Sequence, residues 1–140
     1  MRILLIYGVM NAGKTTACHL LFNDLKAIGA TCSQCDGIDG RSFMQGDDFK
    51  ALLMFRNKIV GIYSAGDGKD YVAAAIDFGL QNKCDYLVAT VRKGIHYSAS
   101  LNRRAPGDTC EWFELAKGNS PAEMTQYEAK IISSIIDNIK

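Results

Sequence analysis

A glycine-rich loop near the N-terminus places the strongest constraint on how this chain can fold. Residues 8–15 read Gly-Val-Met-Asn-Ala-Gly-Lys-Thr, and the apolar segment 2–7 stands directly before them. That segment has no helical spacing and predicts a buried parallel strand. After Lys14 the apolar residues follow the helical period as far as Ile28, and Gly29 supplies a stop. A strand, a glycine loop and a helix in this order favour an anion site, since backbone N–H groups meet there at the positive end of a helix dipole.

The loop matches G-x-x-x-x-G-K-[ST] at every fixed position, and on these residues the chain resembles the P-loop NTPases, the Walker A superfamily. The resemblance covers a small part of the chain. It implies a bound nucleoside triphosphate, ATP or another NTP, with Mg²⁺ as cofactor. Lys14 would reach the β and γ phosphates, and the Thr15 hydroxyl would bind the Mg²⁺. The alternative is a chance glycine turn before a helix. The residues expected at the nucleotide are Gly8, Asn11, Ala12, Gly13, Lys14, Thr15 and Thr16.

Composition predicts one domain over residues 1–140, because 48% of the residues are hydrophobic and the chain is long enough for one sizeable core. Sixteen Lys and Arg against fifteen Asp and Glu leave a formal charge of +1, so no global field favours nucleic acid or an anionic membrane. The N-terminal apolar run is too short for a signal peptide or a membrane span. We therefore expect a cytoplasmic protein without a membrane partner, whose five cysteines are reduced.

Five strand signals alternate with helix signals, which predicts an α/β fold: a three-layer αβα sandwich with a mainly parallel five-stranded sheet, as in P-loop NTPases. Ser120, Pro121 and Glu123 form a capping-box pattern at the start of the last helix. The expected strands are 2–7, 31–35, 58–63, 86–91 and 109–115, and the expected helices are 14–28, a short one at 47–55 with Asp47 as its N-cap, 69–80 and one starting at 121.

A polar turn follows the second predicted strand. It reads Asp36-Gly37-Ile38-Asp39-Gly40-Arg41 and resembles the Asp-Gly-Asp-x-x-Arg signature of adenylylsulfate kinases, with one residue inserted after Gly37 and the Arg two places after the second Asp. The resemblance implies that Asp39 or Asp36 accepts a proton from an acceptor hydroxyl and that Arg41 holds an anionic group of the acceptor. A purely structural turn is the alternative, since Asp-Gly pairs form turns without any ligand.

Just before that turn, Cys32 and Cys35 have the C-x-x-C spacing of metal and redox sites. Residues three apart on a strand point to opposite faces of the sheet, so the two thiols could share an ion only if the strand bends. No second Cys pair or His pair accompanies them. We therefore expect no zinc site here.

The third predicted strand ends at Tyr63 and Ser64, where most ATPases and GTPases carry the acidic Walker B residue that holds Mg²⁺ through water. Its absence weakens the case for an efficient ATPase and suits certain small kinases whose strand also ends in Ser. The following Ser-Ala-Gly resembles the Asp-Thr-Ala-Gly switch of GTPases without its Asp. On that resemblance the Gly66 N–H would face the γ-phosphate, and Asp67 would serve as a carboxylate for the metal; an ordinary Asp-Gly turn explains Asp67 equally well.

The only basic cluster of the sequence follows the fourth predicted strand and includes Arg92, Arg103 and Arg104. In kinases of this superfamily a mobile lid at about this place brings arginines onto the transferring phosphoryl group, so these three are the candidates, Arg92 first. A solvated loop and a nucleic-acid patch are the alternatives. Trp112 is expected to pack rather than to serve as a base platform. Residues 82–85 match the Asn-Lys-x-Asp guanine signature, but they precede a strand and should lie at the edge of the sheet away from the P-loop.

These patterns lead to one functional hypothesis and two alternatives. The hypothesis is an ATP-dependent phosphotransferase that uses Mg²⁺ and passes the γ-phosphate to a hydroxyl or phosphate of a small-molecule or nucleotide acceptor, with Asp36 or Asp39 receiving the acceptor. The first alternative is an ATPase or switch module that acts with a protein or nucleic-acid partner. The second is a GTPase.

Overall fold

The fold was obtained as a computed structural model that describes residues 1–9, 12–94 and 97–140. Asn11, one of the residues expected at the nucleotide, lies outside these ranges. The elements in chain order are β1 (Arg2–Gly8), α1 (Lys14–Ala27), β2 (Thr31–Gly37), the 3₁₀ turn η1 (Phe43–Gln45), β3 (Phe49–Phe55), β4 (Lys58–Tyr63), α2 (Lys69–Gln81), β5 (Tyr86–Arg92), α3 (Ser98–Leu101), β6 (Thr109–Glu114) and α4 (Pro121–Asn138).

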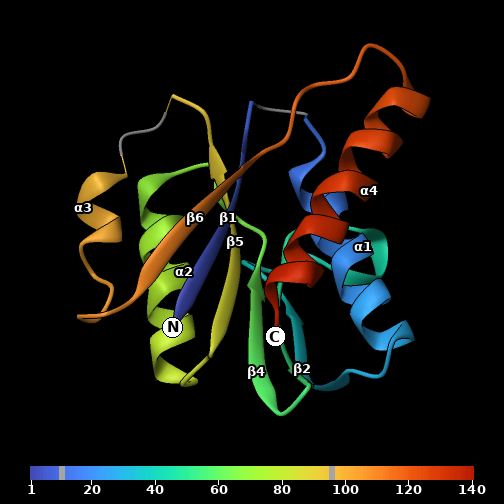
Figure 1. The fold of residues 1–140 in the computed structure, drawn as a ribbon. Coiled ribbons are helices and arrows are strands. Elements are labelled where there is room, and N and C mark those ends of the chain that lie inside the picture. Colours follow the sequence, from blue (N-terminus) through green and yellow to red (C-terminus); the bar gives the residue numbers. More distant parts are fainter. Residues whose placement is uncertain (10–11, 95–96) are drawn as a thin grey trace.

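The described strands form one sheet in the order β2-β3-β4-β5-β1-β6. Strands β4, β5, β1 and β6 are parallel neighbours, whereas β3 runs antiparallel to both β2 and β4. The α/β prediction is therefore confirmed, but the prediction of a mainly parallel five-stranded sheet is wrong. The sheet is mixed and has six strands (Figure 1).

The extra strand is β3, and it occupies the segment predicted as a short helix. Its burial alternates with the period of a strand, since the residues that face the core are Phe49, Ala51, Leu53 and Phe55. Arg56 and Asn57 both have positive φ values, 52° and 62°, as the two central residues of a type I′ hairpin turn do. This turn folds β4 back antiparallel to β3, so the chain forms a hairpin where the acids Asp47 and Asp48 suggested a helix start.

Helices cover both faces of the sheet, with α1 and α4 on one side and α2 and α3 on the other (Figure 1). The apolar core is accordingly in two parts. Along β1, Leu4 and Ile6 belong to the part under α1 and α4, while Ile3 and Leu5 belong to the part under α2. All four side chains are fully buried, and each such burial contributes about 1.5–3 kcal/mol. β1 is thereby held firmly from both sides just before the glycine loop.

The carboxyl ends of the central parallel strands meet at one edge of the sheet, which is the edge where open α/β sheets bind ligands. Gly8 of β1 pairs in register with Arg92 of β5, and Tyr63 of β4 pairs with Ala89. The guanine-like residues 82–85 lie at the opposite edge, as predicted, because the carbonyl of Asp85 accepts from the N–H of Arg2 at the start of β1. In the part of the chain that the structure describes, no helix is long and apolar enough to cross a membrane.

Candidate functional site

Gly8 and Gly13 both stand where an added Cβ would come closer to a neighbour than real Cβ atoms do. A Cβ on Gly8 would lie 2.9 Å from the carbonyl oxygen of Leu115, and a Cβ on Gly13 would lie 2.6 Å from Oε1 of Glu128. Gly13 also has φ +97°, a left-handed conformation that other residues avoid. It is the N-cap of α1 and has no side chain to cap the first turn. The N–H groups of that turn are therefore not satisfied by a capping side chain and are suited to an anion.

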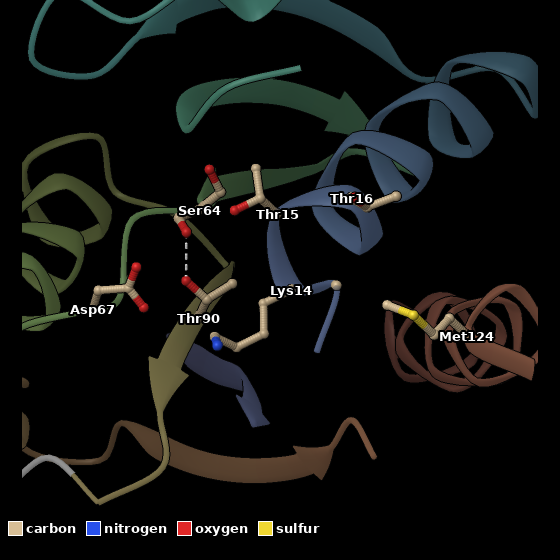
Figure 2. A pocket seen from close by; sticks show the side chains of 8 residues that line it. Lys14, Thr15, Thr16, Ser64, Asp67, Thr90 and Met124 are labelled. Atoms are coloured by element: carbon tan, nitrogen blue, oxygen red, sulfur yellow. Dashed lines mark hydrogen bonds between the residues drawn. The ribbon is translucent and has the colours of Figure 1, made fainter. Parts of the chain in front are cut away.

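A cavity of about 330 Å³ lies at the start of α1, within the range of small-ligand sites. Figure 2 shows Lys14, Thr15, Ser64, Asp67 and Thr90 grouped on one side of it, with Met124 of α4 on the other. The loop after β4, the end of β5, the first turn of α1 and the start of α4 all contribute to its wall. Of the residues expected at a nucleotide, the cavity is lined by Gly13, Lys14, Thr15, Thr16 and Asp67.

Lys14 is 8% exposed and folds back over the glycine loop. Its Nζ donates to the carbonyl oxygens of Gly8, at 3.1 Å, and Val9, at 2.8 Å. Burial lowers the pKa of this ammonium, and the charge of Arg92 lowers it further, while Asp67 and Asp48 partly offset both effects. The two cations and two carboxylates are thus close enough to act on one another at the same edge of the sheet.

Asp48 is the residue that the sequence interpretation missed. It is buried, and its Oδ1 accepts a hydrogen bond from Thr15 Oγ1 at 2.7 Å and another from Ser64 Oγ at 3.3 Å. Its Oδ2 accepts from Arg41 Nη1 at 2.5 Å. Because β3 is antiparallel to β4, the residue that precedes β3 reaches the carboxyl edge of β4 and β5. A carboxylate therefore stands beside Thr15 although β4 itself ends without an acid.

The polar ends of β4 and β5 are fixed by backbone contacts. Ser64 Oγ accepts from the N–H of Phe49 at 2.8 Å, and the Ser64 carbonyl accepts from Thr90 Oγ1 at 2.5 Å (Figure 2). Gly66 is pressed against the same strand, since a Cβ on it would lie 1.9 Å from the carbonyl oxygen of Thr90. Its carbonyl accepts from the N–H of Arg92. The loop after β4 is thereby held against β5, and Asp67 at the cavity wall follows directly from it.

Two of the predicted site residues lie close behind the cavity wall. Ala12 is buried next to Gly8, whose added Cβ would come within 3.4 Å of the Ala12 Cβ. Arg92 ends β5 in register with Gly8, and its charge acts on Lys14. The structure therefore brings Arg92 to the glycine loop.

The acids of the predicted acceptor turn do not line the cavity. Asp36 is exposed on β2, where it accepts from Gln34 Nε2. Asp39, with φ 53°, accepts from the hydroxyl of Tyr71 at 2.7 Å. Arg41, whose side chain is half exposed, is held by Asp48. The turn thus contributes to the site through Arg41 and not through the two carboxylates assigned to the acceptor.

The two lid candidates beyond α3 also lie apart from the cavity lining. Arg103 donates twice to the Asp77 carboxylate of α2, at 3.0 and 2.6 Å, and Arg104 donates to Cys110 Sγ of β6 at 3.5 Å. The cause is the packing of α3 on α2, where Ser100 Oγ donates to the Lys69 carbonyl. α3 and the two arginines that follow it are therefore held against α2 and β6.

Cys32 and Cys35 pack against the same part of the core and do not point to opposite faces of the sheet as predicted, because β2 is not a regular strand. Its pairing with β3 shifts between Cys32 and Gln34, as at a β-bulge, and both thiols pack against the core under α1 and α4. Burial raises the pKa of Cys35 to about 11, and the neighbouring Cys32 adds to the shift. Among the described residues no group of three or more His, Cys, Asp or Glu is arranged to hold a metal ion.

The chain was compared with protein-family models, with curated proteins and with solved structures, and no match was found in any of the three comparisons.

Proposed function

We propose that this protein binds a nucleoside triphosphate with Mg²⁺ at the cavity and transfers the γ-phosphoryl group to a small-molecule or nucleotide acceptor, with ATP as the expected donor. The observation that carries the proposal is the hydrogen bond between Thr15 Oγ1 and the buried Asp48 carboxylate, beside Lys14 and the first turn of α1. It joins the hydroxyl and the carboxylate that a nucleotide-bound magnesium site requires.

The phosphate part of the proposal is supported by three features around Lys14. The close-packed glycines leave the backbone free of side chains, α1 directs the positive end of its dipole at the cavity, and Lys14 supplies a fixed charge. Lys14 Nζ donates to the carbonyls of Gly8 and Val9, and burial, with the nearby charge of Arg92, lowers its pKa although Asp67 and Asp48 partly offset this. A polyphosphate would add negative charge beside this ammonium.

The magnesium part is supported by the donor atoms. Mg²⁺ prefers hard oxygen ligands and is usually held by one or two carboxylates together with substrate phosphates and waters. Thr15 Oγ1 and Asp48 fit that requirement, and Ser64 and Arg41 hold Asp48 in place. When bound there, Mg²⁺ would neutralise charge on the phosphates. The lack of a larger acidic cluster in the described residues is compatible with such a site, since phosphate oxygens complete it.

The structure suggests a different proton acceptor from the ones predicted. Asp67 lines the cavity, is exposed, and acts electrostatically on Lys14, whereas Asp36 and Asp39 do not line it. We infer that Asp67 accepts the proton of the incoming hydroxyl as the phosphoryl group is transferred. Lys14 and Arg92, both near the loop, would stabilise the charge that develops on the transferring group.

Hydrolysis coupled to a partner is the second candidate, and Asp48 is the observation that favours it. The strand β4 ends without an acid, which weakened the case for an ATPase, but the buried Asp48 stands beside Thr15. In this case Asp67 would orient a water molecule instead of an acceptor. A GTPase is tested alongside, by comparing GTP with ATP.

The test has two stages. Melting temperatures are measured with ATP and with GTP, each with and without Mg²⁺, for the wild type and for Lys14→Ala. We expect a Mg²⁺-dependent rise that Lys14→Ala abolishes; an identical response of both proteins would refute nucleotide binding at this loop. Product analysis with nucleosides, nucleotides and sugars as acceptors then separates transfer from hydrolysis, and slow release of free phosphate with every acceptor would contradict the phosphotransferase.

A further inference from the structure

We propose that a partly exposed aromatic surface beside the glycine loop, with the exposed Trp112 at its centre, binds single-stranded nucleic acid. This surface, called the aromatic platform below, consists of Tyr7 of β1, Trp112 of β6 and Tyr97 before α3, with Lys93 and Arg104 at its borders. It is separate from the nucleotide cavity, because none of these residues lines that cavity. The proposal does not depend on the proposed function.

The three rings form one cluster although they come from distant parts of the chain. Trp112 meets Tyr7 edge-on, with ring centroids 5.7 Å apart, and meets Tyr97 at 5.3 Å with the rings tilted by 38°. Trp112 nevertheless keeps 44% of its surface exposed. The sequence interpretation assigned Trp112 to packing, and it does pack, but a large part of the indole stays available to a ligand. Bases of any nucleic-acid sequence can stack on exposed aromatic side chains.

Cations stand on two sides of Trp112. Lys93 Nζ lies 6.0 Å from the ring centre of Tyr7, and Arg104 contacts the Sγ of Cys110, two residues before Trp112 on the same strand. Lys93 also pairs with Glu114 at 3.4 Å, but both side chains are at least half exposed, so this ion pair contributes little and can yield to a phosphate. Aromatic rings flanked by Lys and Arg are the combination that single-stranded binding sites use.

The platform is directly connected to the glycine loop. Tyr7 immediately precedes Gly8, and the N–H of Lys93 donates to the Gly8 carbonyl, which also accepts from Lys14 Nζ. A strand seated on Tyr7 and Lys93 would therefore touch residues that support the nucleotide site. Duplex DNA is a poorer candidate, because the chain carries a formal charge of only +1 and stacking needs unpaired bases.

The platform is tested with a fluorescently labelled oligothymidine of about ten nucleotides, followed by anisotropy at low salt without ATP. We expect Trp112→Ala to weaken binding by about tenfold or more and Trp112→Phe to retain most of it. Lys93→Ala and Arg104→Ala should each make the slope of log K against log salt concentration shallower by about 0.7, as expected when one phosphate contact is lost. Lys130→Ala is the matched control, since Lys130 is exposed on α4 at the other face of the sheet. Trp112 is the only tryptophan, so its fluorescence should be quenched as the oligonucleotide binds.

Three results would each contradict binding of single-stranded nucleic acid to the platform. Failure of the wild type to bind, equal affinity of Trp112→Ala in a protein that still melts cooperatively, or equal competition by a DNA duplex or by polyglutamate would overturn the proposal. The platform and the nucleotide site can fail independently of each other, because the oligonucleotide assay is run without ATP and none of the platform residues lines the nucleotide cavity.

Discussion

Replacing Asp48 by Asn provides the sharpest separation between a magnesium site and an ordinary buried polar contact. The amide keeps the shape of the carboxylate and can still accept from Thr15 Oγ1, so the hydrogen bond of 2.7 Å need not be lost. What is lost is the charge that faces any cation bound by Thr15. Arg41, whose side chain is 50% exposed, can return to water when its partner becomes neutral.

The expected size of the effect follows from the position of Asp48. Two unit charges about 4 Å apart interact by about 4 kcal/mol at an effective dielectric constant of 20, which sets an upper scale. Loss of a supporting group around a bound metal typically weakens metal binding by about 10- to 100-fold, or about 1.4–2.7 kcal/mol. We therefore expect the affinity for ATP in the presence of Mg²⁺ to fall by that factor in Asp48→Asn. ATP without Mg²⁺ should bind as well as before or better, because a negative charge near the phosphates is gone.

Titration calorimetry measures both affinities: ATP is titrated once in the presence of Mg²⁺ and once in the presence of EDTA. Asp47→Asn is the matched control, since it removes the same charge one residue earlier, where Oδ2 accepts from the N–H of Ser42. It should leave the Mg²⁺ dependence intact. If Asp48→Asn retained the full gain in affinity from Mg²⁺, the assignment of Asp48 to the metal would be wrong.

Four further outcomes are expected. Lys14→Ala should lose nucleotide binding in calorimetry while it keeps the circular dichroism of the wild type; retained affinity would contradict the phosphate site. Asp67→Asn should bind ATP normally but lower kcat by about 10²–10⁴, and an unchanged rate would remove Asp67 as the proton acceptor. Gly66→Ala should lower the free energy of unfolding, measured by urea denaturation, by about 3 kcal/mol or more, because the new Cβ would lie 1.9 Å from the Thr90 carbonyl oxygen. A variant as stable as the wild type would show that the loop moves aside easily. The pKa of Cys35 is raised to about 11, so its thiol should be alkylated slowly at pH 8 and about tenfold faster for each pH unit up to 11. Mass spectrometry follows the reaction, and rapid modification at pH 7 would contradict the raised pKa.

Periodicity was sufficient for most of the elements. The strand before Gly8, the helix from Lys14, the strand 58–63 and the helix capped by Ser120 all occur as predicted, because each is specified by local spacing, a cap or a glycine. Periodicity could not place the residues predicted to bind the acceptor. Whether Asp39 lies near the loop depends on strand order and on the path of residues 38–48, and those are decided by long-range packing.

The β3 segment shows why Asp48 was missed. Two acids before a run of apolar residues favour a helix start, since acids are favourable at the positive end of a helix dipole. The hairpin turn at Arg56 and Asn57, together with the alternating burial of β3, overrides that local signal. A strand interpretation of 49–55 would have indicated that Asp48 stands at the edge of the sheet where β4 ends. The pairing of Asp48 with Thr15 then still depends on the place of β3 in the sheet.

Packing also fixed the segment 38–48 against α1. The His19 ring stacks on Phe43 and tilts against Phe49, and its Nε2 lies 2.7 Å from the Asp47 carbonyl. The helix that begins at the glycine loop thus holds both Thr15 and, through this aromatic contact, the loop that carries Asp48. A lone His on the first helix gave no sequence signal for this contact.

A crystal structure of the protein with a non-hydrolysable ATP analogue and Mg²⁺ would show whether the cavity at the start of α1 holds the nucleotide. We expect the β and γ phosphates on the backbone of residues 8–15 beside Lys14, with Mg²⁺ bound to Thr15 Oγ1 on the side that faces Asp48. Phosphates bound elsewhere, or a metal held by other carboxylates with Asp48 still paired to Thr15, Ser64 and Arg41, would contradict the proposal.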